Sequence, residues 1–146
     1  MKQEWEGFIM DDLVIVDCQY DFIDGTLACG HSHEAVAELV RFINSHPVRC
    51  LYTSDWHSPS NGSFKVNGGI WPVHCVAGTK GAELDPAFTE QVKKKENRPS
   101  SENRFLKGQD DKVEEYSAFN GVNQEGKRLG DEASSHVYVG GIASEY

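Results

Sequence analysis

The segment Leu13–Asp17, which reads LVIVD, consists of four apolar residues closed by an aspartate. A continuous apolar run this short is typical of a strand that is buried on both faces of a parallel sheet. Further along, residues 31–44 carry apolar side chains on one helical face, and Ser32 could cap that helix. The segment 48–56 reads VRCLYTSDW and is expected to form a second strand. Strand–helix–strand alternation predicts a βαβ unit, in which the two strands run parallel.

The remainder of the chain continues this alternation. We expect a helix at 85–95, a short strand at 105–106, a turn leading into a helix at 121–133 and a buried strand at 136–141. The lysine-rich stretch 93–104 is expected to be a solvated surface loop. Neither an internal repeat nor an interdomain linker interrupts the pattern, so the 146 residues are interpreted as a single domain.

Composition narrows the classes of function. The formal net charge of −9 disfavours binding to nucleic acid or to an anionic membrane, because both partners require a basic surface. No apolar run approaches the ~20 residues of a membrane span, and the acidic, interrupted N-terminus does not resemble a signal peptide. We therefore expect a cytoplasmic protein. The cysteines lack CxxC spacing and are interpreted as reduced thiols of the core: Cys18, Cys29, Cys50 and Cys75.

Residues suited to chemistry follow the expected strands. Open parallel sheets bind ligands outside the carboxyl ends of their strands, which makes these positions informative. The positions are occupied by Asp17 after the first strand, Asp55 and His57 after the second, Lys107 after the third, and GGIASEY after the last. Alone, Asp17 also fits a loop-capping aspartate, and Lys107 also fits a solvent-facing lysine. As a set, these side chains are typical of a catalytic site.

Asp55 and His57 are separated by one residue, so both side chains point to the same side of an extended segment. A carboxylate oxygen and an imidazole nitrogen are suitable ligands for Zn²⁺, Fe²⁺ or Mn²⁺. His74, in WPVHC, could complete such a site, and a histidine of the core is the alternative. The sequence therefore predicts a divalent metal site, with Zn²⁺ as the first candidate.

Five segments occur in the order in which nicotinamidases have them. They read VDCQYDF, DWH followed by SF, WPVHCVAGTKGAEL, FLKG followed by EYSAF, and VYVGGIASEY. The chain thus resembles the nicotinamidases, which belong to the wider isochorismatase-like cysteine hydrolases. The resemblance, from Leu13 to Tyr146, implies an α/β fold with an open, mostly parallel sheet and helices on both faces. It also implies hydrolysis of nicotinamide to nicotinate and ammonia in NAD salvage, with pyrazinamide as a further substrate and a homo-oligomer as one option.

Roles for individual residues follow from the same resemblance. Asp17 matches the general base and Lys107 the cationic member, which together serve a cysteine nucleophile. A cis peptide bond is implied between Ile142 and Ala143, where it would help to form an oxyanion hole. The metal ligands are matched by Asp55, His57 and His74. The positions that line the substrate pocket are matched by Phe22, Leu27, Trp71, Tyr116 and Tyr146.

Two features depart from the family pattern. Many relatives carry a further histidine where this chain reads SPSNGSF, so Asn61, Ser63 or water is expected to fill that ligand position. In the family, the nucleophilic cysteine directly follows the residue matched by Tyr146. We therefore expect the chain to be cut just before its nucleophile and before the last elements of the sheet. Cys18 and Cys75 are expected to point away from the site, because neighbouring side chains of an extended segment face opposite ways.

Two other functions stay open at this point. An isochorismatase-type hydrolase would act without a thiol nucleophile, although the DWH motif together with His74 favours a nicotinamidase. A truncated, non-catalytic domain would bind a metal or a pyridine ring without turnover.

Overall fold

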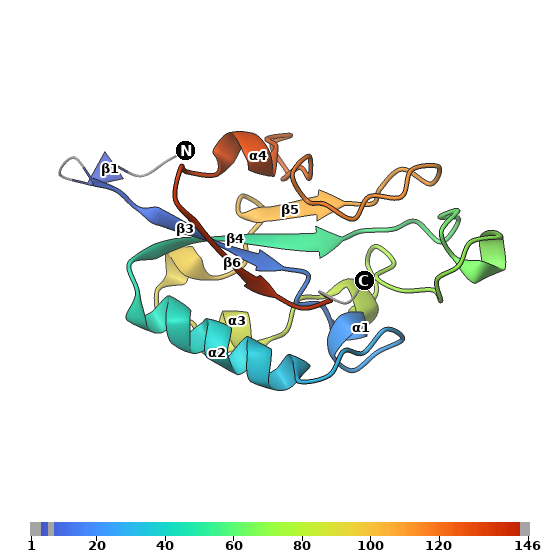
Figure 1. The fold of residues 1–146 in the computed structure, drawn as a ribbon, viewed down its shortest axis with the longest axis horizontal. Helices are drawn as coiled ribbons and strands as arrows, with labels where there is room; N and C mark the ends of the chain where they lie inside the picture. Colours follow the sequence, from blue (N-terminus) through green and yellow to red (C-terminus); the bar gives the residue numbers. More distant parts are fainter. Residues whose placement is uncertain (1–3, 6–7, 144–146) are drawn as a thin grey trace.

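A parallel sheet forms the centre of the molecule in the computed structural model, which describes residues 4–5 and 8–143 (Figure 1). The four strands run in the same direction in the order β5–β4–β3–β6. They span Asp11–Val16 (β3), Val48–Asp55 (β4), Arg104–Lys107 (β5) and Val137–Gly141 (β6). An antiparallel pair precedes them in the chain, formed by β1 (Glu4–Trp5) and β2 (Phe8–Ile9). The expected α/β fold with a parallel sheet is confirmed.

One long helix and several short helical segments connect the strands. The long helix is α2 (Ser32–Ser45). The other α-helices are α1 (Tyr20–Ile23), α3 (Ala87–Glu90) and α4 (Leu129–Glu132). Three 3₁₀ segments are η1 (Lys65–Asn67), η2 (Lys80–Ala82) and η3 (Lys95–Asn97). Within the described ranges, no helix has the length and apolar character that crossing a membrane would require.

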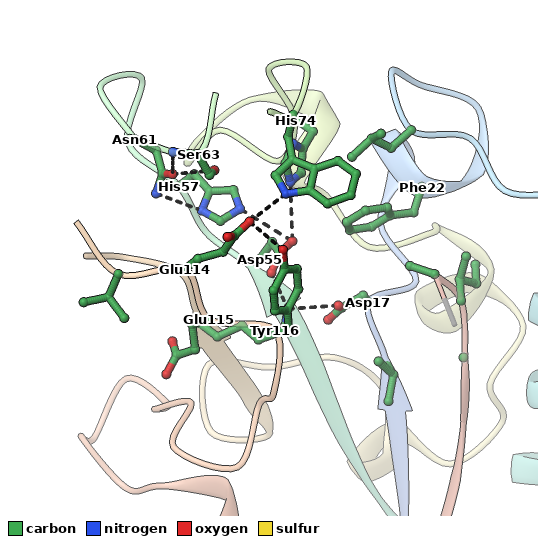
Figure 2. Close-up of a pocket in the computed structure, with 18 of the residues that line it drawn as sticks. Asp17, Phe22, Asp55, His57, Asn61, Ser63, His74, Glu114, Glu115 and Tyr116 are labelled. Atoms are coloured by element: carbon green, nitrogen blue, oxygen red, sulfur yellow. Dashed lines mark hydrogen bonds and ion pairs between the residues drawn. The ribbon is translucent and has the colours of Figure 1, made fainter. Parts of the chain in front are cut away.

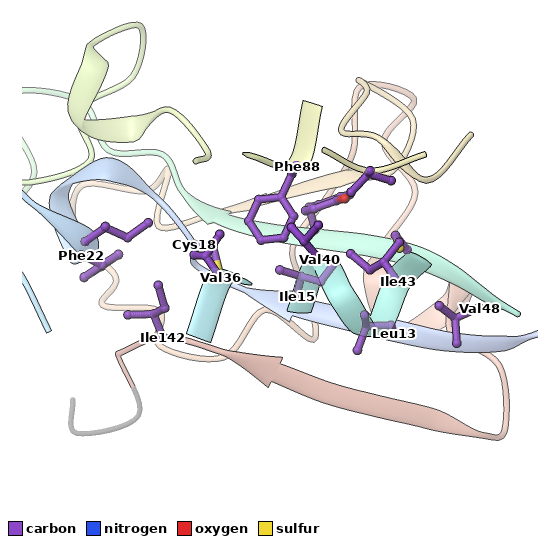
Figure 3. Packing of buried hydrophobic residues seen from close by; sticks show 14 of the residues in the cluster. Leu13, Ile15, Cys18, Phe22, Val36, Val40, Ile43, Val48, Phe88 and Ile142 are labelled. Atoms are coloured by element: carbon purple, nitrogen blue, oxygen red, sulfur yellow. The ribbon is translucent and has the colours of Figure 1, made fainter. Parts of the chain in front are cut away.

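The two faces of the sheet carry separate cores, because successive side chains of a strand point to opposite faces. On one face, Leu13 and Ile15 of β3 pack against α2 and α3, as Figure 3 shows. The helical partners there are Val36, Val40, Ile43 and Phe88. On the other face, Val14 packs with Leu51, Phe105 and Leu129, which begins α4. The strand β3 is thus buried on both faces, as its continuous apolar run predicts.

The start of α2 differs from the expectation. His31, with φ 60°, occupies the N-cap position, and Ser32 is the first helical residue. The Ser32 hydroxyl donates to the Cys29 carbonyl and does not cap the helix. A local side-chain bond to the preceding turn has therefore replaced the expected cap.

The helix expected at 85–95 ends early, since α3 covers only Ala87–Glu90. The Asn44 side chain, at the end of α2, donates to the Gln91 carbonyl and accepts from the Lys93 amide, both at 2.9 Å. These two bonds tie the segment to α2 and take the place of the next helical turn. The lysines that follow are exposed, as expected for a surface loop.

The last strand, β6, is more exposed than its apolar sequence suggests. Val137, Tyr138 and Val139 are 39%, 48% and 70% exposed. Among the strands that the structure describes, β6 lies at the edge of the sheet and pairs only with β3. The expectation of a buried strand is wrong here. The side chains of a strand are buried only where other elements pack over both of its faces, and few do so over β6.

Candidate active site

The carboxyl ends of β3, β4 and β5 open into one cavity of about 420 Å³. Asp17 lies directly after β3, while Asp55 and Lys107 are the last residues of β4 and β5. All three line the cavity together with His57 and His74. Figure 2 shows Asp17, Asp55 and the two histidines around it. The structure therefore brings together side chains that are up to 90 positions apart in the sequence.

Lys107 connects the two carboxylates. Its Nζ lies 3.1 Å from Asp17 Oδ2 and also donates to Asp55 Oδ1. Burial alone would lower the pKa of Lys107, but the charges of Asp17 and Asp55 raise it above the ordinary value. The side chain is therefore a buried ammonium held between two strands.

Asp17 occupies a strained position at the strand end, with a φ of 52°. Its Oδ1 accepts a hydrogen bond of 2.7 Å from the Thr53 hydroxyl. Burial raises the pKa of Asp17 above the usual value and the Asp55 charge adds to this, while Lys107 and Thr53 act in the opposite direction. A carboxylate with a raised pKa is suited to taking up a proton and giving it back.

Asp55, His57 and His74 form a compact cluster of metal-ligating atoms, all within 4.8 Å of one another. Asp55 Oδ2 lies 3.5 Å from His57 Nε2 and 3.7 Å from His74 Nε2. Burial works to raise the pKa of Asp55, but the two imidazoles and Lys107 hold it well below its usual range. Burial works to lower the pKa of His57, whereas Asp55 and the Gly108 carbonyl raise it.

The hydrogen bonds of the two histidines occupy Nδ1 of each ring and leave Nε2 to bind a metal. His57 Nδ1 donates to the Gly108 carbonyl at 2.7 Å, and His74 Nδ1 donates to the Pro72 carbonyl at 2.8 Å. Each ring therefore presents Nε2 to Asp55, and its other nitrogen is bound by a carbonyl, as is usual for metal-binding histidines. Metal bonds of about 2.0–2.2 Å at tetrahedral angles separate two ligand atoms by roughly 3.3–3.6 Å. The Asp55–His57 separation of 3.5 Å lies within this range and the Asp55–His74 separation of 3.7 Å just above it, close to what a shared divalent ion requires.

The position of the His57 ring requires a glycine at residue 108, in the FLKG motif. Its φ is 71°, and a Cβ at this position would lie 2.4 Å from His57 Cε1. Only glycine combines this backbone conformation with the close approach of the ring. The motif FLKG thus supplies both the ammonium and the carbonyl that orients the imidazole.

Aromatic and aliphatic side chains form the walls of the cavity. Phe22, Leu27, Trp71 and Tyr116 all line it. The Phe22 ring lies 5.7 Å from the His74 ring, so this wall directly adjoins the metal-ligating cluster. At the mouth, one carboxylate oxygen of Glu114 accepts from Trp71 Nε1 at 2.6 Å and from the Tyr116 hydroxyl at 2.7 Å (Figure 2).

The segment after β6 differs in part from the expectation. Ile142 and Ala143 line the cavity, but no peptide bond within residues 4–5 and 8–143 is cis. The expected cis bond is therefore wrong for this structure, in which Ala143 redirects the chain with a φ of 65° instead. The Ile142 amide donates to the Val16 carbonyl at 3.0 Å and is already used in the sheet. Tyr146, expected at the pocket, lies outside the described residues.

Asn61 and Ser63, expected as ligand candidates, line the cavity as well. Asn61 Oδ1 accepts from the amide and the hydroxyl of Ser63, and its Nδ2 lies 3.3 Å from the Gly108 carbonyl. Asn61 thus supports the loop around His57, with its oxygen turned to Ser63.

Sequence reasoning missed several residues that shape the site: Gln19, Thr53, Glu114 and Glu115. Gln19 stands inside the VDCQYDF segment, where the motif itself was a signal. Glu115 likewise begins the quoted EYSAF segment, whereas Thr53, inside a strand, and Glu114, inside a loop, gave no such signal.

The cysteines lie away from the cavity, and all four carry thiols. Cys18 and Cys75 are fully buried in the core beside α2 and do not line the cavity, in agreement with the expectation. Burial raises the pKa of both thiols, and nearby carboxylates raise it further. Neither side chain has the exposure or the thiolate character of a nucleophile.

Several known proteins that resemble this chain are nicotinamidases or pyrazinamidases. No protein-family model matches the chain. The nicotinamidase of Escherichia coli (strain K12) is 30% identical over 158 residues, which cover 92% of this chain and 70% of that protein. The crystal structure of an L. infantum protein in complex with nicotinate matches with a TM-score of 0.72 at 29% identity, covering 92% of this chain and 67% of that one. The pyrazinamidase of Pyrococcus horikoshii in complex with zinc matches with a TM-score of 0.70 at 28% identity, covering 93% and 72%.

These matches, together with the parallel sheet and its cavity, define an amide hydrolase. More narrowly, the chain belongs to the nicotinamidase family. The relatives' names favour an amidase over the isochorismatase-type alternative.

Proposed function

We propose that the cavity binds nicotinamide and is the site of its hydrolysis to nicotinate and ammonia. The observation that carries this proposal is the presence of the Asp17–Lys107 pair and the Asp55–His57–His74 cluster in one cavity with aromatic walls. Its volume of about 420 Å³ is in the range of small-molecule sites. The nicotinate in the L. infantum structure and the name of the P. horikoshii relative support a pyridine or pyrazine amide as substrate.

Asp55, His57 and His74 would hold the divalent ion. Zn²⁺ is the first candidate because two imidazoles and a carboxylate are a common zinc ligand set, and Fe²⁺ or Mn²⁺ are the alternatives. A bound ion supplies Lewis acidity, which orients an electron-pair donor such as a ring nitrogen and makes water more acidic. The zinc in the P. horikoshii structure supports this assignment.

The nucleophile in this proposal is a cysteine thiol next to Tyr146, contributed by residues beyond this chain, as the family resemblance implies. Asp17 accepts the thiol proton, and the Lys107 ammonium stabilises the thiolate. The sulfur attacks the amide carbon, Asp17 returns the proton to the amide nitrogen, and the C–N bond breaks to release ammonia. Asp17 then takes a proton from water, whose oxygen attacks the thioester carbon. The C–S bond breaks, the sulfur takes the proton back from Asp17, and the acid loses its own proton to solvent and leaves as nicotinate.

The Ala143 amide is our candidate for stabilising the oxyanion, since the Ile142 amide is engaged by Val16. Trp71 and Tyr116 would bind the flat ring at the mouth of the cavity, and Phe22 would bind it beside His74.

Ammonia release from nicotinamide tests the function. The 146-residue chain is compared with a protein extended past Tyr146 through the cysteine and the segment that follow it in the family. We expect release by the extended protein, none by its Asp17→Asn variant and none by the 146-residue chain. Turnover by the 146-residue chain would refute the assignment of the nucleophile. A folded, metal-loaded extended protein without turnover would refute the function and leave a non-catalytic binding domain.

The wider biological setting stays a prediction. Returning nicotinamide to NAD through nicotinate is the role that we propose, in the cytoplasm and in a form that is monomeric or homo-oligomeric. The net charge of −9 supports a small-molecule substrate over nucleic acid or membrane partners.

A further inference from the structure

Gln19 is fully buried, and its side-chain amide binds both main-chain groups of Asp55. Nε2 donates to the Asp55 carbonyl at 2.8 Å, and Oε1 accepts from the Asp55 amide at 2.8 Å. Nε2 also donates to the Ala82 carbonyl at 2.9 Å. All the hydrogen-bonding atoms of this side chain are thus used, and two of the three bonds go to one metal-ligating residue.

The path of β3 explains why a side chain, and not a neighbouring strand, binds the main chain of Asp55. The main chain of β3 pairs with β4 as far as Ile15 opposite Tyr52, and the Asp17 amide still donates to the Thr53 carbonyl. Asp17 then turns the chain away with its φ of 52°. Asp55 lies beyond the last of these pairs, and the Gln19 amide takes the place of the missing strand.

Asp55 is therefore held from both sides. On the other edge of β4, Asp55 is in register with Lys107 of β5. His57 is held independently of Gln19, because its main chain pairs with Cys75 and Ala77. A displacement of the Asp55 carboxylate would consequently change its distance to the His57 ring.

We propose that Gln19 is a positioning residue. Its amide fixes the Asp55 main chain in the position from which the carboxylate reaches both histidines and Lys107. This inference rests on the proposed function in one respect, namely that the cluster binds a divalent ion. A purely structural role would affect the stability of the fold and leave metal affinity unchanged.

The experiment compares two substitutions of buried amides by apolar side chains of similar size. Gln19→Met removes the three bonds without adding charge. Asn123→Leu is the matched control: Asn123 is also buried and also makes three bonds to main-chain groups, but it lines a separate cavity. For each variant, the Zn²⁺ dissociation constant is measured by competition with a chromophoric chelator, and the melting temperature is measured without metal.

Both variants should melt at lower temperature than the unsubstituted chain. Only Gln19→Met should also bind Zn²⁺ more weakly, by about 10–100-fold, which is typical of lost support behind a metal ligand. If Gln19→Met does not fold, Gln19→Asn replaces it, because this shorter amide cannot reach both groups of Asp55 and should still weaken binding.

An unchanged Zn²⁺ affinity in the folded Gln19 variant would overturn the inference, as would an equal loss in Asn123→Leu. Failure of the unsubstituted chain to bind Zn²⁺ is a different result. It would refute the metal site of the proposed function, and with it any role of Gln19 in positioning a ligand.

Discussion

Lys107 Nζ lies 3.1 Å from Asp17 Oδ2, and the two residues are only 3% and 6% exposed. The same ammonium contacts Asp55, so one buried cation serves carboxylates from two neighbouring strands. Two carboxylates this deep in the protein would raise each other's pKa unless a cation compensated them. Lys107 therefore joins the proposed proton-transfer residue to the proposed metal site.

Lys107→Met should destabilise the fold strongly, because it leaves two buried carboxylates without their cation. We expect a loss of roughly 3–5 kcal/mol in the free energy of unfolding, measured with urea. Lys127→Met is the control, since Lys127 pairs with Glu125 at the surface and its loss should leave the free energy of unfolding nearly unchanged. Similar losses in the two variants would contradict the role assigned to Lys107.

The stability deficit of Lys107→Met, which is the free energy of unfolding lost relative to the unsubstituted chain, should depend on pH and gives a second test. In the unsubstituted chain, the lowered pKa of Asp55 contributes stability above its unfolded pKa, and this is lost as the pH falls through the folded pKa. Without Lys107, burial should raise the pKa of Asp17 further, while the two imidazoles still act on Asp55, so that protonation of Asp17 favours the folded state. The deficit should thus shrink from about pH 8 toward about pH 4. A deficit that grows on acidification would argue against this.

Gly108→Ala should weaken metal binding through His57. The added Cβ would lie 2.4 Å from His57 Cε1 and would displace the ring. Gly126→Ala provides the control, because Gly126 has a similar φ of 77° with open space around it. Both substitutions should cost about 1–2 kcal/mol in backbone strain, but only Gly108→Ala should lower Zn²⁺ affinity, by at least ~10-fold. Equal Zn²⁺ affinities of the two variants would show that Gly108 serves the backbone alone.

Glu114 should control how firmly the mouth of the cavity holds a ring, since it accepts from both Trp71 and Tyr116. Glu114→Ala should weaken nicotinamide binding by roughly 3–10-fold, measured by calorimetry on the zinc-loaded chain. Glu114→Gln keeps an acceptor oxygen and should bind within about 2-fold of the unsubstituted chain. Glu125→Ala, at a different cavity, is the control and should change nothing. Comparable losses in the Ala and Gln variants would mean that the charge of Glu114 acts, and not its hydrogen bonds.

The thiols should react in an order set by burial. Cys18, Cys50 and Cys75 are buried, and burial raises the pKa of Cys50 to about 12. Cys29 is half-buried and should react first with a thiol reagent in the native chain. Mass spectrometry of the labelled protein identifies the order, and denaturation should make all four equally reactive. If Cys75 is labelled as fast as Cys29, the Cys75 thiol would be accessible, and Cys75 would again be a candidate nucleophile.

The strands and the meeting of the site residues could be anticipated from the sequence. The continuous apolar run LVIVD identifies β3, and parallel strands bring Asp17, Asp55 and Lys107 to one edge. The spacing of Asp55 and His57 likewise predicts that both side chains face the same side.

Features that depend on tertiary contacts could not be predicted from the sequence alone. The early end of α3 depends on the Asn44 side chain of another helix. The exposure of β6 depends on which strands neighbour it. Gln19 could be quoted as part of a motif, but its bonds to Asp55 depend on where β3 turns away from β4.

The central claim is that the cavity binds a pyridine amide beside a divalent ion held by Asp55, His57 and His74. Calorimetric titration of the 146-residue chain with nicotinamide, with Zn²⁺ and after chelation, measures this directly. We predict saturable binding to the zinc-loaded chain, and binding at least ~10-fold weaker after chelation, in His74→Ala, or with benzamide, which lacks the ring nitrogen. No binding to the zinc-loaded chain, or the same dissociation constant with and without zinc, would contradict the claim.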